Sequence, residues 1–336
     1  MRPYYEDDHA VLYHGDCLEV LANLPSGRFA ALLTDPPYFQ VKDDAWDNQW
    51  DGSRAFLNWM ESVASAVKKN LTANASIWVF ASPAMTSSVE QVIGAHYRLL
   101  NSIRWVKYQG WHQKAELSSL RSFLTPWEGI VFAEQFADQY GEQSAALHKQ
   151  VFAPIGRYIQ QERERAGWRR SDVEVALGYV SKSDPTRGTA LCYRWEEGSS
   201  LPTAEAYGRL REVLNSSGGE YLSREYDELR REYDELRRPF RVVNKAHATD
   251  IWDFPTVAPY PGKHPCEKPQ VMLRHMLEVS TRPNDTVLDL FAGSGSTLIA
   301  ARDTGRKCVG VELEERYCEL IAKRLAQGAF DFGDAA

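Results

Sequence analysis

Two short stretches carry residues whose types and spacing could support group-transfer chemistry. The first is Asp35-Pro36-Pro37-Tyr38, which follows an apolar run. A carboxylate, a Pro36 carbonyl that Pro37 holds in one direction, and an aromatic ring meet the demands of alkylating an aromatic amine. Two acceptors on the amine N–H bonds expose its lone pair, the carboxylate stabilises the developing cation, and the ring offers a stacking face. The alternative is a proline-stiffened turn that Asp35 caps.

The second stretch, DLFAGSGST from Asp289 to Thr297, predicts a strand, a glycine turn and a helix that starts near Ser296. Such a turn points backbone N–H groups at a ligand. The stretch lacks the lysine of a phosphate-binding loop, and Leu298 stands where a dinucleotide fingerprint needs a third glycine. Glu312, at the end of the next expected strand, can bond both hydroxyls of a ribose. These parts fit S-adenosylmethionine, with a structural turn or an NAD site as the alternatives.

The surrounding segments must bring these two stretches together. Residues 10–135, and again those after about 245, alternate between short apolar runs and helical patterns. This alternation predicts an α/β fold with a doubly wound, mostly parallel sheet. Ligands bind such sheets at the carboxyl ends of strands, near the point where the strand order reverses. Because both stretches follow strands, we expect them at that edge.

Composition narrows the class of protein. The 336 residues are 43% hydrophobic and 25% charged, which is ordinary for a globular protein of about two domains. We expect a cytoplasmic protein, because no apolar run reaches the roughly 18 residues of a membrane helix and the acidic N-terminus is unlike a signal peptide. The five scattered cysteines predict reduced thiols and no metal site. A net charge of -7 still allows a DNA-binding protein with a local basic face.

Between the two α/β halves, helical periodicity replaces strands. Residues 153–178 and 189–214 each predict a pair of helices. The arrangement is similar to helix-turn-helix domains of the phage-repressor type, and an ordinary helical bundle with a charged surface is the alternative. If it reads DNA, we expect six side chains to face the duplex, with Tyr193 or Arg194 nearest the bases. They are Arg169, Arg170, Lys182, Arg187, Tyr193 and Arg194.

The segment REYDELR occurs twice in succession, at 224–230 and 231–237. Its tyrosines and leucines form one helical stripe, which predicts a helix on the protein's own surface or, alternatively, the seam of a homodimer. The expected organisation is a catalytic half at 1–135, a recognition insert at 136–215, an amphipathic helix connector at 216–244 and a cofactor half at 245–336.

With these motifs the chain resembles the amino-group DNA methyltransferases, in the class whose catalytic motif precedes the cofactor motif. The family's (D/N/S)-P-P-(Y/F/W) matches residues 35–38, and its F-x-G-x-G matches residues 291–295. An H-x-x-x-K-P element resembles residues 264–269. The resemblance covers about two thirds of the chain, residues 10–135 and 245–328.

The resemblance implies a circularly permuted, Rossmann-like methyltransferase with seven strands, one of them antiparallel, and a helical insert domain. It also implies S-adenosylmethionine as cofactor and double-stranded DNA as partner, with the target base flipped out of the helix. The implied catalytic residues are Asp35, Pro36, Pro37 and Tyr38. The implied cofactor-binding residues are Asp16, Asp35, Lys268, Asp289, Phe291, Gly293, Gly295, Ser296, Thr297 and Glu312.

In this family an aspartate at the first motif position is more typical of adenine N6 enzymes, and serine of cytosine N4 enzymes. We therefore expect a site-specific DNA adenine-N6 methyltransferase, with a cytosine N4 enzyme as the alternative. A DNA-binding regulator with an inactive methyltransferase body is a second alternative. A protein-glutamine methyltransferase usually has asparagine first and the opposite motif order. After the catalytic motif, Trp46 and Trp50 are expected to close over the flipped base or to brace the pocket, with core packing as the alternative.

Overall fold

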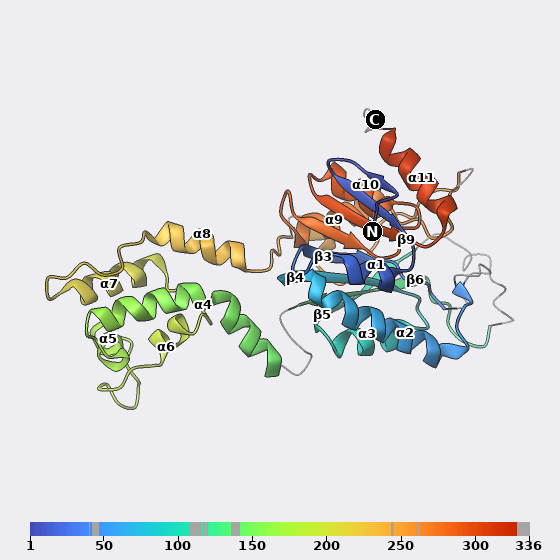
Figure 1. The fold of residues 1–336 in the computed structure, drawn as a ribbon. Coiled ribbons are helices and arrows are strands. Elements are labelled where there is room, and N and C mark those ends of the chain that lie inside the picture. The colour runs from blue at the N-terminus through green and yellow to red at the C-terminus, as the bar shows by residue number, and fades with distance from the viewer. Residues whose placement is uncertain are drawn as a thin grey trace. The chain divides into compact units, whose positions relative to one another are not determined.

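The short apolar runs form one sheet, which has nine strands in the part of the chain that the structure describes (Figure 1). The structure is a computed structural model and describes residues 1–39, 41, 47–107, 116, 118, 120–135, 142–242, 245–260 and 263–327, without the side chains of 142–151. The strands are β1 (Tyr5–Glu6), β2 (Ala10–His14), β3 (Phe29–Thr34), β4 (Leu71–Ala81), β5 (Arg98–Val106), β6 (Trp127–Glu134), β7 (Ile251–Trp252), β8 (Thr286–Asp289) and β9 (Lys307–Glu312).

The strand order is β1-β2-β9-β8-β3-β4-β6-β5-β7. Among the described strands, β1 and β7 have two residues each, and the seven longer ones are parallel except β6, which is antiparallel to β4 and β5. The expected doubly wound, mostly parallel sheet is confirmed. The edge strands β1 and β7 were not predicted, because a strand of two residues is too short to show an alternating hydrophobic pattern. The chain runs from β8 to β9 on one side and from β3 to β4 on the other, so the order reverses between β8 and β3.

Helices cover both faces of the sheet (Figure 1). Alternate residues of β3 face opposite ways, with Leu32 packing on one group of helices and Leu33 on the other. The first group is α1 (Cys17–Asn23), α2 (Gly52–Val67) and α3 (Thr86–Gly94). The second is α9 (Gln270–Ser280), α10 (Ser296–Asp303) and α11 (Glu315–Ala326). Short 3₁₀ helices are η2 (Lys68–Asn70) and η5 (Lys245–His247). No described helix is long and apolar enough to cross a membrane.

A separate helical unit interrupts the sheet unit. The sheet unit comprises Met1–Tyr140 and Pro239–Ala336, and the helical unit comprises Gly141–Arg238. Helices of the latter are α4 (Glu142–Arg165), α5 (Arg170–Ala176), α6 (Leu191–Glu196), α7 (Ala204–Asn215) and α8 (Tyr226–Leu236). Residues 136–141 of the expected recognition insert lie outside the described residues.

The repeated segment forms α8, which belongs to the helical unit. Leu229 is fully buried in its core, and Tyr226, Tyr233 and Leu236 pack against the same cluster. The apolar stripe is therefore covered by the chain itself, as the first of the two alternatives expected. The unit boundary lies near Arg238, whereas the sequence suggested a connector that begins at 216, because α8 needs this core to bury its stripe.

Residues 153–178 and 189–214 each contain two helices, as expected, and the first range ends with α5 while the second begins with α6. The connection between them folds into a small hairpin, in which Val180 bridges Gly188 and the Ser181 N–H donates to the Arg187 carbonyl at 2.8 Å. Buried Glu174 of α5 accepts hydrogen bonds from the backbone N–H groups of Ala190 and Cys192 at the start of α6. A carboxylate from one helix thus caps the next and fixes their junction.

A buried carboxylate also joins three helices of this unit. Glu196 Oε1 accepts from Arg163 Nε at 2.5 Å, and Glu196 Oε2 accepts from Arg170 Nε at 2.5 Å. The Glu196 side chain is 2% exposed. Removing one partner of such a buried network leaves uncompensated charge.

Glu196→Ala should therefore lower the free energy of unfolding of the helical unit by roughly 3 kcal/mol, since two arginines lose their buried acceptor. Hydrogen exchange of the full-length protein measures this as faster exchange across α4 to α7, with the sheet unit unchanged. Glu212→Ala, at an exposed position of α7, serves as the control. Equal protection in both variants would contradict the assigned role of Glu196.

Candidate functional site

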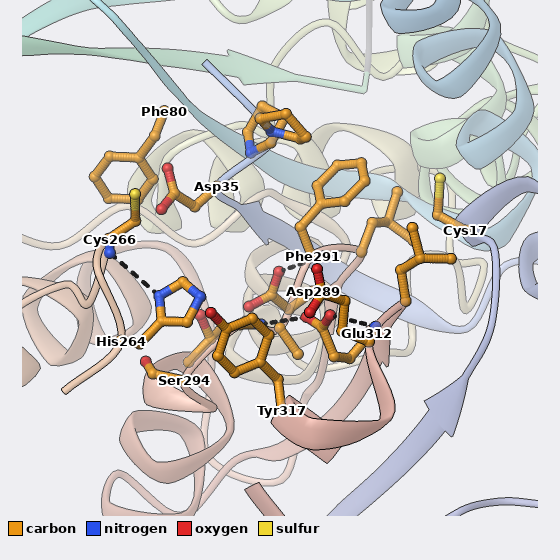
Figure 2. Close-up of a pocket in the computed structure, with 18 of the residues that line it drawn as sticks. Cys17, Asp35, Phe80, His264, Cys266, Asp289, Phe291, Ser294, Glu312 and Tyr317 are labelled. Carbon is orange, nitrogen blue, oxygen red and sulfur yellow. Dashed lines mark hydrogen bonds between the residues drawn. The ribbon is translucent and has the colours of Figure 1, made fainter. Parts of the chain in front are cut away.

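The catalytic and glycine-rich stretches meet at the switch point of the sheet. β3 and β8 are parallel neighbours, so their carboxyl ends lie side by side. Thr34 Oγ1 donates to Asp289 Oδ1 at 3.1 Å and accepts from the Leu290 N–H at 3.2 Å. Tyr38 and Phe291, which follow these strands, line one cavity. Figure 2 shows Asp35 to the left of Phe291 and above Asp289 and Glu312 in this cavity.

The cavity brings together nearly all of the predicted site residues. Gly295 is the exception, because it lies behind the cavity wall, where its φ of +77° begins α10 and its N–H donates to the Ala292 carbonyl at 2.7 Å. Ser294 lines the cavity in its place. The predicted residues in the lining are Asp16, Asp35, Pro36, Pro37, Tyr38, Lys268, Asp289, Phe291, Gly293, Ser296, Thr297 and Glu312.

The two carboxylate oxygens of Asp35 differ in their hydrogen bonding. Oδ2 accepts a hydrogen bond from Lys268 Nζ at 2.5 Å. Oδ1 is buried, and no described residue donates to it. Burial raises the pKa of the Asp35 carboxyl, while the Lys268 ammonium opposes this shift. One acceptor of Asp35 is therefore not used by any described residue.

Lys268 lies at the catalytic stretch. Its Nζ is 3.7 Å from Glu128 Oε2, and it lies over the Tyr38 ring at 5.1 Å and the Phe80 ring at 4.8 Å. Although burial disfavours its charge, Asp35 and Glu128 raise the pKa of Lys268 above its ordinary value. Lys268 is therefore a buried cation held between two acids and two rings.

Sequence reasoning missed two acids of this corner, Glu128 and Asp47. Fully buried Asp47 accepts from the backbone N–H groups of Tyr38 and Val41 at 2.6 and 2.7 Å, and so fixes the loop after the motif. Glu128 was detectable as a charged residue within an apolar strand. Asp47 gave no such signal, because it lies among several other acids of a polar loop.

The glycine-rich turn is shaped by its conformation and by a close neighbour. Gly293 has a φ of +50°, and a Cβ on it would lie 3.2 Å from the His264 ring. Its N–H donates to Glu312 Oε2 at 2.8 Å, while Glu312 Oε1 accepts from the Glu314 N–H at 2.8 Å. Burial raises the pKa of Glu312 to about 7 and that of Asp289 to about 6.

Asp16 reaches the same cavity from the end of β2. Its carboxylate caps α1, accepting from the Leu18 N–H at 2.9 Å and the Glu19 N–H at 3.2 Å. The Gly15 N–H donates to the Glu312 carbonyl at 2.9 Å, which ties the ends of β2 and β9 together. The two acids are thus held at neighbouring points of the cavity.

Aromatic rings form the wall beside Phe291. Its ring centroid is 5.5 Å from that of Trp59, which is 4.8 Å from that of Trp50. Trp50 also packs edge-on against Phe56. Trp50 therefore packs against the core cluster behind Trp59, which lines the cavity, whereas Trp46 lies outside the described residues.

The lining fits S-adenosylmethionine. The unsubstituted Gly293 leaves room where a side chain would press on His264, and Glu312 offers carboxylate oxygens beside it for hydroxyl groups. The unpaired Asp35 Oδ1 offers a buried acceptor elsewhere in the same cavity. Over the described ranges, no three His, Cys, Asp or Glu side chains are placed to share a metal ion.

The predicted DNA-contacting side chains lie around α5 and α6 of the helical unit. Arg170 differs from the rest, because it is paired with Glu196 and lies over the Tyr193 ring at 5.4 Å. Arg187 is 82% exposed in the hairpin, 3.8 Å from Asp184. The exposed members of the set are Arg169, Lys182, Arg187, Tyr193 and Arg194.

The sequence matches a known family over most of its length. A family model described as DNA methylase, for N6 and N4 methylation, matches residues 29–324. The Type II methyltransferase M.ScaI of Streptomyces caespitosus is 22% identical over 96% of this chain and 84% of its own length.

Solved structures share the fold. PvuII DNA methyltransferase, described as cytosine-N4-specific, has 15% identity and a TM-score of 0.54, covering 98% of this chain and 91% of that one. TTHA0409 of Thermus thermophilus, complexed with S-adenosyl-L-methionine, has 20% identity and a TM-score of 0.51, covering 96% and 97%.

Buried Glu312 should make the ligand-free protein less stable as the pH rises. The unfolded glutamate ionises near pH 4.5 and the folded one near pH 7, so between these values the folded state holds the extra proton. Stability therefore falls from pH 5 to 8, by roughly 2 kcal/mol for this group, at about 1.4 kcal/mol per pKa unit. In Glu312→Gln, the fall in melting temperature over this range should be smaller than in the wild type.

Glu319→Gln, on the exposed side of α11, should keep the wild-type pH dependence. Identical falls in melting temperature for Glu312→Gln and the wild type would show that Glu312 does not titrate in this way.

Proposed function

The chain belongs to the DNA methylase family of S-adenosylmethionine-dependent enzymes, and on this premise we propose that it methylates the exocyclic N6 amine of adenine at a specific site in double-stranded DNA. One observation carries this proposal. The catalytic and glycine-rich stretches line a single cavity, in which Asp35 Oδ1 is a buried acceptor that no described residue uses.

Each group of the catalytic corner has a task in amine methylation. Bound S-adenosylmethionine supplies a methyl group carried on a sulfonium. Asp35 Oδ1 accepts one N–H of the amine and the Pro36 carbonyl accepts the other, while Tyr38 stacks on the flipped base. The amine nitrogen bonds to the methyl carbon as the carbon–sulfur bond breaks, and one amine proton leaves through Asp35 to water. The enzyme contributes mainly positioning and charge.

The cofactor is held by the other side of the cavity. Glu312 bonds the ribose hydroxyls, Asp16 contacts the adenine side, and the backbone around Gly293 approaches the ligand closely. Lys268 contributes by fixing Asp35. The remaining proposed contacts come from Asp289, Phe291, Ser296 and Thr297, with Gly295 shaping the turn.

Adenine is the proposed base because Asp35 occupies the first motif position. Cytosine N4 is the second candidate, since the PvuII enzyme of the same fold is described as specific for it. Mass analysis of nucleosides from DNA methylated by the purified protein distinguishes N6-methyladenine from N4-methylcytosine.

Asp35→Asn should reduce methyl transfer to DNA by at least about 100-fold, because the side chain loses its negative charge and one of its two acceptor oxygens becomes an NH2 donor. The affinity for S-adenosylmethionine should stay within about threefold, since Glu312 and the glycine-rich turn are untouched. A radiolabelled transfer assay and calorimetric titration measure the two effects.

Asp51→Asn is the matched control, because Asp51 is exposed before α2 and its side chain caps no helix N–H. Near-normal turnover of Asp35→Asn would remove the role proposed for this carboxylate.

The helical unit is proposed to hold the DNA. Exposed cations around α5 and α6 suit contacts with phosphates, which supply affinity but no base readout. Tyr193 and Arg194, exposed on α6, are the proposed base-contacting residues.

Lys182→Ala and Arg187→Ala should each weaken DNA binding several-fold and reduce the slope of log affinity against log salt by about 1, because one phosphate contact is lost. Fluorescence anisotropy across a salt series measures both quantities. Arg230→Ala removes an exposed cation on α8 and should leave the slope unchanged. A slope equal to the wild type in Lys182→Ala and Arg187→Ala would place the DNA elsewhere.

A further inference from the structure

Glu128 reaches the catalytic corner because of the direction of its strand. β6 is antiparallel to β4 and β5, so it begins at the edge where they end. Glu128 is its second residue and pairs in register with Trp105, near the end of β5. The same edge carries the loop that follows β3. An acid at the start of a strand thus reaches an edge where the neighbouring strands end.

Its carboxylate contacts three side chains of this corner. Oε2 accepts the Tyr38 hydroxyl at 3.0 Å and lies 3.7 Å from Lys268 Nζ, while Oε1 accepts from the Lys107 ammonium. The Glu128 side chain is 17% exposed. Although burial disfavours its ionised form, Lys268 and Lys107 lower the pKa of the Glu128 carboxyl. The group is therefore a carboxylate at neutral pH.

Glu128 completes a three-point attachment of Tyr38. The Tyr38 N–H donates to Asp47 Oδ1 at 2.6 Å, and its carbonyl accepts from the Ser82 hydroxyl at 3.3 Å. These two contacts fix the backbone. The bond from the Tyr38 hydroxyl to Glu128 is charge-assisted and fixes the direction of the ring.

Glu128 also competes with Asp35 for one buried cation. Lys268 Nζ is 2.5 Å from Asp35 and 3.7 Å from Glu128. Lys107 gives Glu128 a cation of its own, so Lys268 keeps its short contact with Asp35. This contact occupies Asp35 Oδ2 and leaves Oδ1 open.

We propose that Glu128 is a positioning residue of the methyl-transfer site, which holds the Tyr38 ring through its hydroxyl group. The inference rests on the proposed methyl transfer. Glu128 acts through Tyr38, so its removal should impair turnover more than cofactor binding.

Glu128→Gln tests the charge, because glutamine keeps an acceptor for the Tyr38 hydroxyl. Asp35 faces Lys268, Glu128, Asp289 and the Tyr38 hydroxyl, and the negative charge of Glu128 favours its protonated form. Measured with saturating DNA and S-adenosylmethionine, kcat should stay within about threefold of the wild type in Glu128→Gln, whereas Glu128→Ala, which removes the acceptor, should lower it by about 10- to 100-fold. In Glu128→Gln, the acid limb of the kcat–pH profile should shift to lower pH by about one unit. The Kd for S-adenosylmethionine should stay within about threefold.

Glu134→Gln is the matched control on the same strand. Glu134 is 11% exposed in its side chain and pairs with Arg98 at the opposite end of β6. Its variant should keep the wild-type kcat and pH profile.

The shared contact is tested with Tyr38→Phe, Glu128→Ala and the double variant. If the two residues act together, the double variant should be no more than about twofold slower than Glu128→Ala. Effects that multiply, an unshifted acid limb, or a Glu128→Gln protein that loses cofactor binding would each overturn the positioning role. Absence of methyl transfer by the unaltered protein would contradict the proposed function itself.

Discussion

The parallel pairing of β3 with β8 is the constraint on which the site depends. The chemistry requires an amine acceptor and a cofactor turn in one cavity, yet Thr34 and Asp289 are 255 residues apart. Pairing β3 with β8 brings the carboxyl ends of both strands to one edge of the sheet. The hydrogen bond between Thr34 and Asp289 then holds the two strand ends level with each other. The reversal of strand order at this point opens the crevice. The insertion of the helical unit elsewhere in the chain leaves this geometry intact.

Much of the sheet, and the edge that carries the site, could be predicted, because local sequence patterns determine where strands and helices begin and end. The run Phe29–Thr34 became β3 with the bounds that its apolar residues gave, and the helix from Ser296 began at the glycine turn. Parallel strands place their following loops on one edge, so the shared edge of Asp35 and the glycine turn could be predicted, whereas their meeting also required β3 to pair with β8. A residue such as Asp35 can be assigned to this edge because it directly follows a predicted strand.

The missed residues depend on pairings that sequence spacing does not reveal. Glu128 reaches the catalytic edge only because β6 is antiparallel, and this direction is set by its neighbours. Asp47 accepts hydrogen bonds from two backbone N–H groups. Backbone donors are present at almost every residue, so they do not mark one acid of the sequence over another. Lys268 was predicted as a cofactor-binding residue and lines the cavity, while its contact with Asp35, 233 residues away, gave no signal in the sequence. Tertiary contacts of this kind leave no local periodicity to detect.

The buried acids explain how one cavity combines binding with reactivity. Burial raises the pKa values of Asp35, Asp289 and Glu312, so the ligand-free protein holds carboxylates where ionisation is unfavourable. At the catalytic corner, lysine ammonium groups offset the free-energy cost of ionising a buried carboxylate. At Glu312, hydrogen bonds from backbone N–H groups offset part of the same cost. Among these three acids, Asp35 Oδ1 is the oxygen for which the described residues provide no donor. A donor that reaches it would therefore stabilise the folded protein on binding.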